Sequence, residues 1–405
     1  MFMGKLATIR FGCTILLSTS ELAIAFTGTM GGAGASENVR AVKDALDKYN
    51  HGDFDGAVAL LTEVLNTKAL SDASAAIVQY DRGMVYLAKA DKASAIDDFQ
   101  AAIQKSPHYQ APYLMLAEAY FAVGRADEGI TELKAAIAVD PGSAAAHLNL
   151  ANAYYYRNED DQALAEYNEA VRLDGSAFAH EGRGTVYLRR DDADKAVADL
   201  SIAIEMKPAY LEAYINRAMA YDRLGDGKHA IGDLDTALKL APSNLDARVD
   251  RANVYADLGE RDLAIADYTV AIKASFHNAP LLRSRGDAYL AEGDYTKAIV
   301  DYDAALQQTP NDPSLLLNRG AAFYKLRDYD RAIADYFAAQ KLTPKDARLY
   351  DGLGSAYGAQ GKLDAAIAAY DEALRLEPGY VTARRDREGA LKAKMTGQKI
   401  VVDNP

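Results

Sequence analysis

The chain has 405 residues, half of them apolar, and its formal net charge is -13. That much apolar material can fill a hydrophobic core, which excludes disorder over most of the length. The acidic balance disfavours nucleic acids and anionic membrane surfaces as partners, because both attract basic patches.

The leading segment has the order of a secretory signal peptide: a short basic start, an apolar run at 11–19, and small-residue sites that end at Ala25 and Ala35. The apolar run is too short to span a bilayer as a helix, so we expect no integral membrane segment in the mature chain. We predict a signal peptide over 1–25, cleaved after residue 25 or 35, and a flexible leader over 26–37. This predicts a periplasmic or secreted protein. The alternative is a disordered tail that is not cleaved, on a cytoplasmic protein.

An internal repeat organises the rest of the chain. An aromatic residue recurs every 34 residues, with one step of 33. This column runs through Tyr86, Tyr120, Tyr154, Tyr187, Tyr221, Tyr255, Tyr289, Phe323 and Tyr357. Two columns of small residues beginning at Ala95 and Ala102, and a mostly proline column beginning at Pro107, keep the same steps. Self-similarity at this period is typical of a helical repeat array.

Each repeat predicts a pair of helices. In one typical unit, the apolar residues from Tyr214 to Leu224 follow helical spacing, and a glycine-rich turn follows them. A second helix from His229 to Leu240 ends before Pro242, because proline cannot continue the helical hydrogen bonds. The alanine columns lie where the helices cross and allow their backbones to approach closely.

These columns resemble the tetratricopeptide repeat. The resemblance implies an all-α fold, a right-handed superhelical solenoid of about ten helix hairpins with a concave groove. A degenerate first repeat covers 38–66, nine units cover 76–380, a capping helix covers 381–395, and a loose tail covers 396–405. The nine units are 76–109, 110–143, 144–176, 177–210, 211–244, 245–278, 279–312, 313–346 and 347–380. The last helix is rich in Arg and Lys; a polar cap covers the stacking face of a terminal repeat, and a basic docking site is the alternative.

One departure from the family pattern recurs inside this chain. Six units have Arg at their seventh residue, where the family usually has Leu, and the same six have Asp at their twenty-third. These pairs are Arg82–Asp98, Arg183–Asp199, Arg217–Asp233, Arg251–Asp267, Arg285–Asp301 and Arg319–Asp335. Because the turn lies midway between them, the two side chains should face each other, and we predict a bidentate ion pair in each unit. We interpret the pairs as structural; an anion site is the alternative.

The resemblance also places the groove on the first helix of each unit and implies two zones of candidate binding residues. Early units supply an apolar and aromatic zone: Leu114, Phe121, Leu148, Asn152, Tyr155 and Tyr156. Middle units supply a mostly acidic zone: Glu212, Asp222, Arg223, Asp246, Asp257, Arg283 and Asp287. A partner helix or extended peptide could lay apolar residues on the first zone and basic residues on the second. The alternative is a solvated surface without a ligand.

No residue pattern predicts catalysis. The six histidines lack zinc-binding spacing, and no glycine-rich phosphate loop is present. We predict no catalytic residue, metal or cofactor, and a non-enzymatic scaffold or adaptor in the cell envelope that binds protein or peptide partners, with no nucleic acid. The alternatives are a cytosolic scaffold or co-chaperone, and a substrate-binding subunit for a separate glycosyltransferase.

Overall fold

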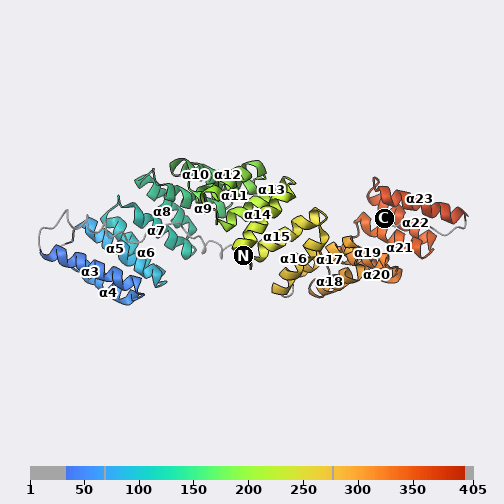
Figure 1. The fold of residues 1–405 in the computed structure, drawn as a ribbon, viewed down its shortest axis with the longest axis horizontal. Helices are drawn as coiled ribbons and strands as arrows, with labels where there is room; N and C mark the ends of the chain where they lie inside the picture. Colours follow the sequence, from blue (N-terminus) through green and yellow to red (C-terminus); the bar gives the residue numbers. More distant parts are fainter. Residues whose placement is uncertain (1–32, 68–69, 276–277, 397–405) are drawn as a thin grey trace. The chain divides into compact units, whose positions relative to one another are not determined.

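The computed structural model describes residues 33–67, 70–275 and 278–396, which form helices and turns and no strand. The chain divides into two compact parts, residues 1–216 and 217–405. Figure 1 shows the helices, coloured along the sequence. The first part holds α3 (Ala33–Asn50), α4 (Phe54–Leu65), α5 (Asp72–Ala88), α6 (Lys92–Lys105), α7 (Gln110–Ala122), α8 (Ala126–Val139), α9 (Ala144–Tyr156), α10 (Asp160–Leu173), α11 (Ala177–Arg189) and α12 (Ala193–Met206). The division falls within α13 (Leu211–Arg223).

The second part continues the same alternation of helices. It holds α14 (Gly227–Leu240), α15 (Leu245–Asp257), α16 (Arg261–Ala274), α17 (Ala279–Glu292), α18 (Tyr295–Gln308), α19 (Pro313–Lys325), α20 (Tyr329–Leu342), α21 (Ala347–Ala359), α22 (Leu363–Leu376) and α23 (Val381–Thr396). Over the described stretches, no helix combines the length and apolarity that crossing a bilayer requires.

Consecutive helices pair as hairpins, which confirms the predicted repeat. In each hairpin a short turn joins the first helix to the second, and the two helices pack along their length. The turn requires one residue with a left-handed backbone. Gly225 supplies it with φ 73°, and Asn158, a residue type that tolerates this conformation, supplies it elsewhere with φ 59°. The following Asp226 caps the second helix, since its carboxylate accepts a hydrogen bond from the His229 N–H.

The second helices supply the most deeply buried side chains. The alanine column that begins at Ala102 is fully buried in all nine units. Beside it lies a column that the sequence analysis did not single out, the twenty-fourth residue of each unit. It comprises Phe99, Leu133, Tyr167, Leu200, Leu234, Tyr268, Tyr302, Tyr336 and Tyr370, none more than 3% exposed. Small residues opposite admit the aromatic rings; a Cβ on Gly286 would come within 2.8 Å of the Tyr302 ring.

The ends of the repeat array differ slightly from the predicted boundaries. Helix α3 begins at Ala33, so the prediction of a flexible leader is wrong for residues 33–37, which are mostly good helix formers. The degenerate first repeat is the α3–α4 hairpin. At the other end, α23 packs against α22 and α21 and buries Ala383 and Ala390. The predicted signal peptide and residues 397–405 of the predicted tail lie outside the described residues.

Candidate binding surfaces

The first helices of neighbouring hairpins contact one another, as α9 and α11 do in the first part and α19 and α21 in the second. Among the described residues, second helices of neighbouring hairpins make no contacts of this extent. Each part therefore curves with its first helices on the inner side. We call this surface the first-helix face; the predicted groove residues belong to it.

The six Arg–Asp pairs have the geometry of bidentate ion pairs. Each Arg donates from Nε and Nη2 to the two carboxylate oxygens of its Asp, over 2.6–2.8 Å. The Asp side chains are 4–8% exposed and the Arg side chains 17–22%. The hydrogen bonds that Arg285 donates to the Asp301 carboxylate raise the pKa of its guanidinium. The pairs thus lie between the two helices of a hairpin, where charge-assisted bonds are strong.

At least five of these arginines also bond to the preceding hairpin, a contact that the sequence analysis missed. The remaining nitrogen, Nη1, donates to a polar side chain at the twenty-fifth residue of the preceding unit or, for Arg82, to Thr62 of the first hairpin. The bonds are Arg82–Thr62 at 2.9 Å, Arg183–Asn168 at 2.9 Å, Arg251–Asp235 at 2.6 Å, Arg285–Thr269 at 3.0 Å and Arg319–Asp303 at 2.5 Å. In α23, Arg387 donates to Asp371 in the same register. All three guanidinium nitrogens of these five arginines are therefore engaged, which supports a structural role over an anion site.

Two members of the predicted aromatic zone are not on the surface. Leu114 and Phe121 are each 3% exposed and belong to the hydrophobic core of the first part, so the prediction that they line a groove is wrong. Phe121 reaches the interior because its hairpin has Gly129 where the other units have Ala. A Cβ on Gly129 would lie 2.8 Å from the Phe121 ring, closer than packed atoms allow.

The remaining members of the aromatic zone lie together on α9, where each is half-buried. The rings of Tyr155 and Tyr156 meet edge to face with centroids 5.5 Å apart, and the Arg189 guanidinium stacks 3.9 Å from the Tyr155 centroid. Asn152 accepts a hydrogen bond from the Tyr167 hydroxyl at 2.5 Å. Burial raises the pKa of both Tyr155 and Tyr156, so both hydroxyls remain protonated donors at neutral pH.

Two carboxyl groups on the first-helix face of the first part were missed by the sequence analysis. Glu181 accepts hydrogen bonds from Thr185 at 3.0 Å, Asn216 at 2.9 Å and Tyr210 at 3.2 Å, and burial raises its pKa. Glu118 makes no hydrogen bond or ion pair with the described residues, and burial raises its pKa to about 7. The signal was a carboxylate at a first-helix position where neighbouring units have apolar or amide side chains.

The predicted acidic zone includes residues of both parts of the chain. Glu212 belongs to the first part and the other six residues to the second. Asp222, Arg223, Asp246 and Asp257 are exposed on α13 and α15. Asp287 is half-buried and already accepts hydrogen bonds, from the Tyr302 hydroxyl at 2.7 Å and the Asn318 amide at 2.8 Å.

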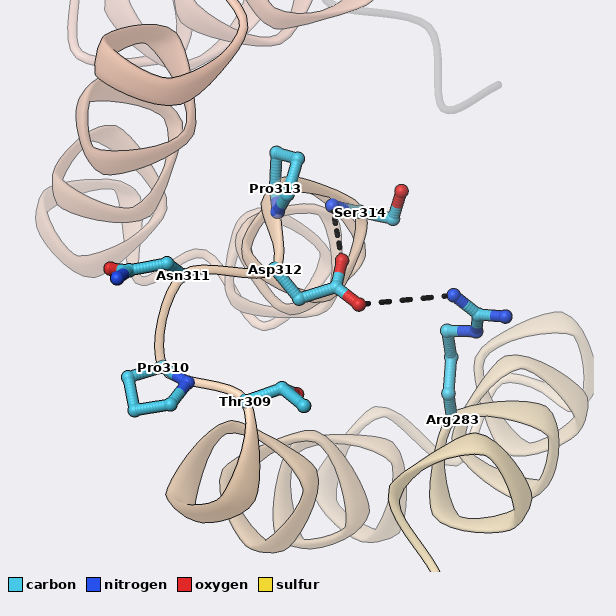
Figure 2. A pocket seen from close by; sticks show the side chains of 7 residues that line it. All are labelled: Arg283, Thr309, Pro310, Asn311, Asp312, Pro313 and Ser314. Carbon is cyan, nitrogen blue, oxygen red and sulfur yellow. Dashed lines mark hydrogen bonds and ion pairs between the residues drawn. The ribbon is translucent and has the colours of Figure 1, made fainter. Parts of the chain in front are cut away.

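Arg283 stands apart from that acidic surface, at an open hollow of about 530 Å³ beside the loop from α18 to α19 (Figure 2). Its guanidinium lies 3.9 Å from the Asp312 carboxylate. Asp312 caps α19 by accepting from the Ser314 N–H at 2.9 Å and the Leu315 N–H at 3.2 Å. Because this carboxylate occupies the start of α19, the hollow is not arranged to hold an anion there.

The described residues contain no group of three or more His, Cys, Asp or Glu side chains arranged to hold a metal ion. The carboxylates of the six Arg–Asp pairs are buried and bonded to guanidinium groups. The first-helix face presents half-buried aromatic rings, amides and carboxylates.

Comparisons with known proteins agree with this architecture. Family models described as tetratricopeptide repeat match residues 43–109, 114–178, 181–244 and 217–280, and further models of the repeat match 86–138, 286–327 and 347–380. A search of the curated proteins finds no match. Among solved structures, the C-terminal part of a TPR repeat-containing protein from Cytophaga hutchinsonii is similar with a TM-score of 0.50 and 19% identity, over 59% of this chain and 98% of that one.

Two longer solved structures are similar over most of this chain. A chain of the APC/C hetero-tetramer Cut9-Hcn1 matches with a TM-score of 0.45 and 17% identity, over 92% of this chain and 87% of that one. Yeast Tom70 matches with a TM-score of 0.38 and 13% identity, over 89% of this chain and 96% of that one.

Proposed function

The chain belongs to the tetratricopeptide-repeat family, and we propose that it is a non-enzymatic scaffold of the cell envelope that binds protein or peptide partners on its first-helix face. The observation that carries the proposal is the Tyr155–Tyr156 pair, two half-buried rings held at fixed geometry on α9. Tyrosines of this kind bury much area at low entropic cost and retain a hydroxyl for hydrogen bonding, which suits them to protein interfaces.

Polar groups on the same first-helix face support recognition of a peptide backbone. The Asn152 side-chain oxygen is used by Tyr167, which leaves its amide N–H groups for an acceptor on a partner. Glu118 offers a desolvated carboxyl without a partner among the described residues. A peptide that donates to Glu118 and accepts from Asn152 would compensate groups that the chain leaves unsatisfied.

The envelope location rests on the order of basic, apolar and small residues in the leading segment. Mass spectrometry of the mature amino terminus tests it in the native organism. A terminus at residue 26 or 36 supports export, and an intact Met1 refutes it.

Site-specific photo-crosslinking tests where partners bind. A benzoylphenylalanine is placed at Leu148, on the first-helix face, or at Ile202, a 39%-exposed residue on the second helix α12 of the same part. Crosslinks to partner proteins in native cells are expected from position 148 and not from 202. Equal labelling from both positions, or from neither, would contradict the proposal.

A double variant then tests the aromatic pair itself. Tyr155→Ala with Tyr156→Ala should abolish the crosslinks from position 148. The matched control is Phe337→Ala, which removes a 41%-exposed aromatic side chain from the second helix α20. If the control and the double variant lose the same partners, the aromatic pair is not the binding surface.

A further inference from the structure

A hollow of about 150 Å³ lies between α13 and α15 in the second part. Leu234 and Val254, which are 1% and 4% exposed, are its buried apolar lining, and the half-exposed Met219 lies beside them. The carboxylates of Asp222 and Asp250 also line it. The hollow is smaller than the roughly 300–1,000 Å³ that encloses a drug-sized ligand, and it suits a single side chain.

The two carboxylates at this hollow are not paired with a cation of the described chain. Neither the Asp222 nor the Asp250 carboxylate forms a hydrogen bond or ion pair with the described residues, and desolvation raises the pKa of both. Asp257 adds to the shift at Asp222, and Asp246 and Asp222 add to the shift at Asp250, so these four carboxylates lie within reach of one another's charge.

The arginines of α15 are committed elsewhere. Arg248 bonds to Asp267 and to the Pro242 carbonyl, and Arg251 bonds to Asp267 and Asp235. Arg223 lines the hollow as well. Its single positive charge is outnumbered by the two lining carboxylates, Asp222 and Asp250, and by the nearby charges of Asp246 and Asp257. The hollow therefore keeps a negative charge that a cation from outside would neutralise.

Asn253 adds a hydrogen-bond donor at the same place. Its side-chain oxygen accepts from the Tyr268 hydroxyl at 2.6 Å, which fixes the amide so that its nitrogen serves as a donor. Apolar walls, two carboxylates and an amide donor match a side chain with an aliphatic stem and a cationic head, followed by a backbone carbonyl.

We propose that this hollow binds an arginine or lysine side chain of a partner's peptide segment, with its stem against Met219, Leu234 and Val254 and its head between Asp222 and Asp250. The inference rests on the proposed scaffold function and names the chemistry of the partner at this part of the first-helix face. An organic cation fits better than a metal ion, because no group of carboxylates in the described chain is arranged for metal binding. A neutral or acidic segment would leave the carboxylates uncompensated.

The methyl group of Met219 reports on the hollow directly. The full chain is labelled with ¹³C-methyl methionine and titrated with the capped peptide acetyl-Gly-Ala-Arg-Ala-Gly-amide. The neutral counterpart has citrulline in place of arginine, which keeps the shape and removes the charge. We expect a saturable shift of the Met219 resonance with the arginine peptide and at least a tenfold weaker effect with citrulline. Equal shifts, or no saturable shift at 10 mM peptide, would overturn the proposal.

Paired variants assign the effect to the two carboxylates. Asp222→Asn with Asp250→Asn should abolish the arginine-dependent shift. The control Glu260→Gln removes an exposed carboxylate from the α15–α16 loop of the same part and should preserve it. The double variant relieves charge repulsion, so its unfolding temperature should not fall; binding that persists in it would refute the role of these residues.

Failure of the inference is distinguishable from failure of the scaffold function. If crosslinking from position 148 captures partners while the Met219 titration is silent, the scaffold stands and the hollow is not a cation site. If Met219 responds to arginine while no position crosslinks to a partner, the hollow binds cations and the scaffold function fails.

Discussion

Removal of Asp301 tests whether the recurring ion pairs stabilise the hairpins. In the α17–α18 hairpin, Asp301 is 4% and Arg285 17% exposed in their side chains, and two hydrogen bonds of 2.7 and 2.8 Å join them. Removing one partner of a buried pair costs about 3–5 kcal/mol, because the other charge is left buried and uncompensated. Arg285 retains its bond to Thr269 and some exposure, so we expect Asp301→Ala to cost about 3 kcal/mol, at the lower end of that range.

An exposed ion pair in the same part provides the matched control. Lys394 and Asp364 are 53% and 81% exposed, and a pair of this kind contributes at most about 1 kcal/mol. Asp364→Ala should therefore change stability little. The two variants differ in burial and geometry but remove the same side-chain type.

Urea unfolding followed by circular dichroism and amide hydrogen exchange measures the loss. Because each hairpin contacts only its neighbours, the effect should concentrate in α17, α18 and the adjoining helices rather than spread evenly. A second variant, Arg285→Met with Asp301→Leu, replaces both charges with apolar groups and should recover most of the loss. If Asp301→Ala destabilises no more than Asp364→Ala, the pairs do not fix the hairpins.

Three further outcomes follow from the described contacts. Burial raises the pKa of Glu118 from 4.5 to about 7 and so favours its protonated form. The folded state is therefore not penalised by this group below pH 4.5 and loses stability as the pH rises through 7. In urea titrations, Glu118→Gln should raise the free energy of unfolding by up to about 3 kcal/mol at pH 8 and leave it nearly unchanged at pH 4. Phe121→Ala should cost about 3–5 kcal/mol in the same assay, since it empties a buried ring site; a loss below 1 kcal/mol would place the ring outside the core. Arg387→Ala removes the half-exposed bond to Asp371 and should cost less than about 1 kcal/mol, with faster hydrogen exchange in α23 and no change in α5.

The sequence predicted the repeat and its hairpins because periodic residues record local geometry. A turn lies midway between two residues sixteen apart, so Arg285 and Asp301 had to face each other once both helices formed. The same reasoning located the turn at Gly225 and the second helix after it. These features depend on contacts within one hairpin, which the order of residues describes directly.

Contacts between hairpins were not predictable in the same way. The bond from Arg285 to Thr269 depends on the shift and rotation between two neighbouring hairpins. The sequence of a single unit does not describe that relation. Phe121 illustrates a second limit. Its position in the repeat predicted a groove residue. However, Gly129 replaces the Ala of the other units, and the missing methyl group leaves space for the Phe121 ring in the core. The period of the repeat alone does not reveal this packing.

The placement of carboxylates separates two roles within one repeat. Where an aspartate lies between the helices of a hairpin, as Asp301 does, an arginine of the same hairpin donates a hydrogen bond to each of the two carboxylate oxygens. On the first-helix face, Glu118 and Asp250 are desolvated by their surroundings and receive no such partner among the described residues. Burying a charge without compensation costs stability, so these groups lower the folding stability of the chain when no partner is bound. A partner that supplies hydrogen-bond donors to these carboxylates would remove that cost on binding. Partners of the scaffold are therefore expected on the first-helix face.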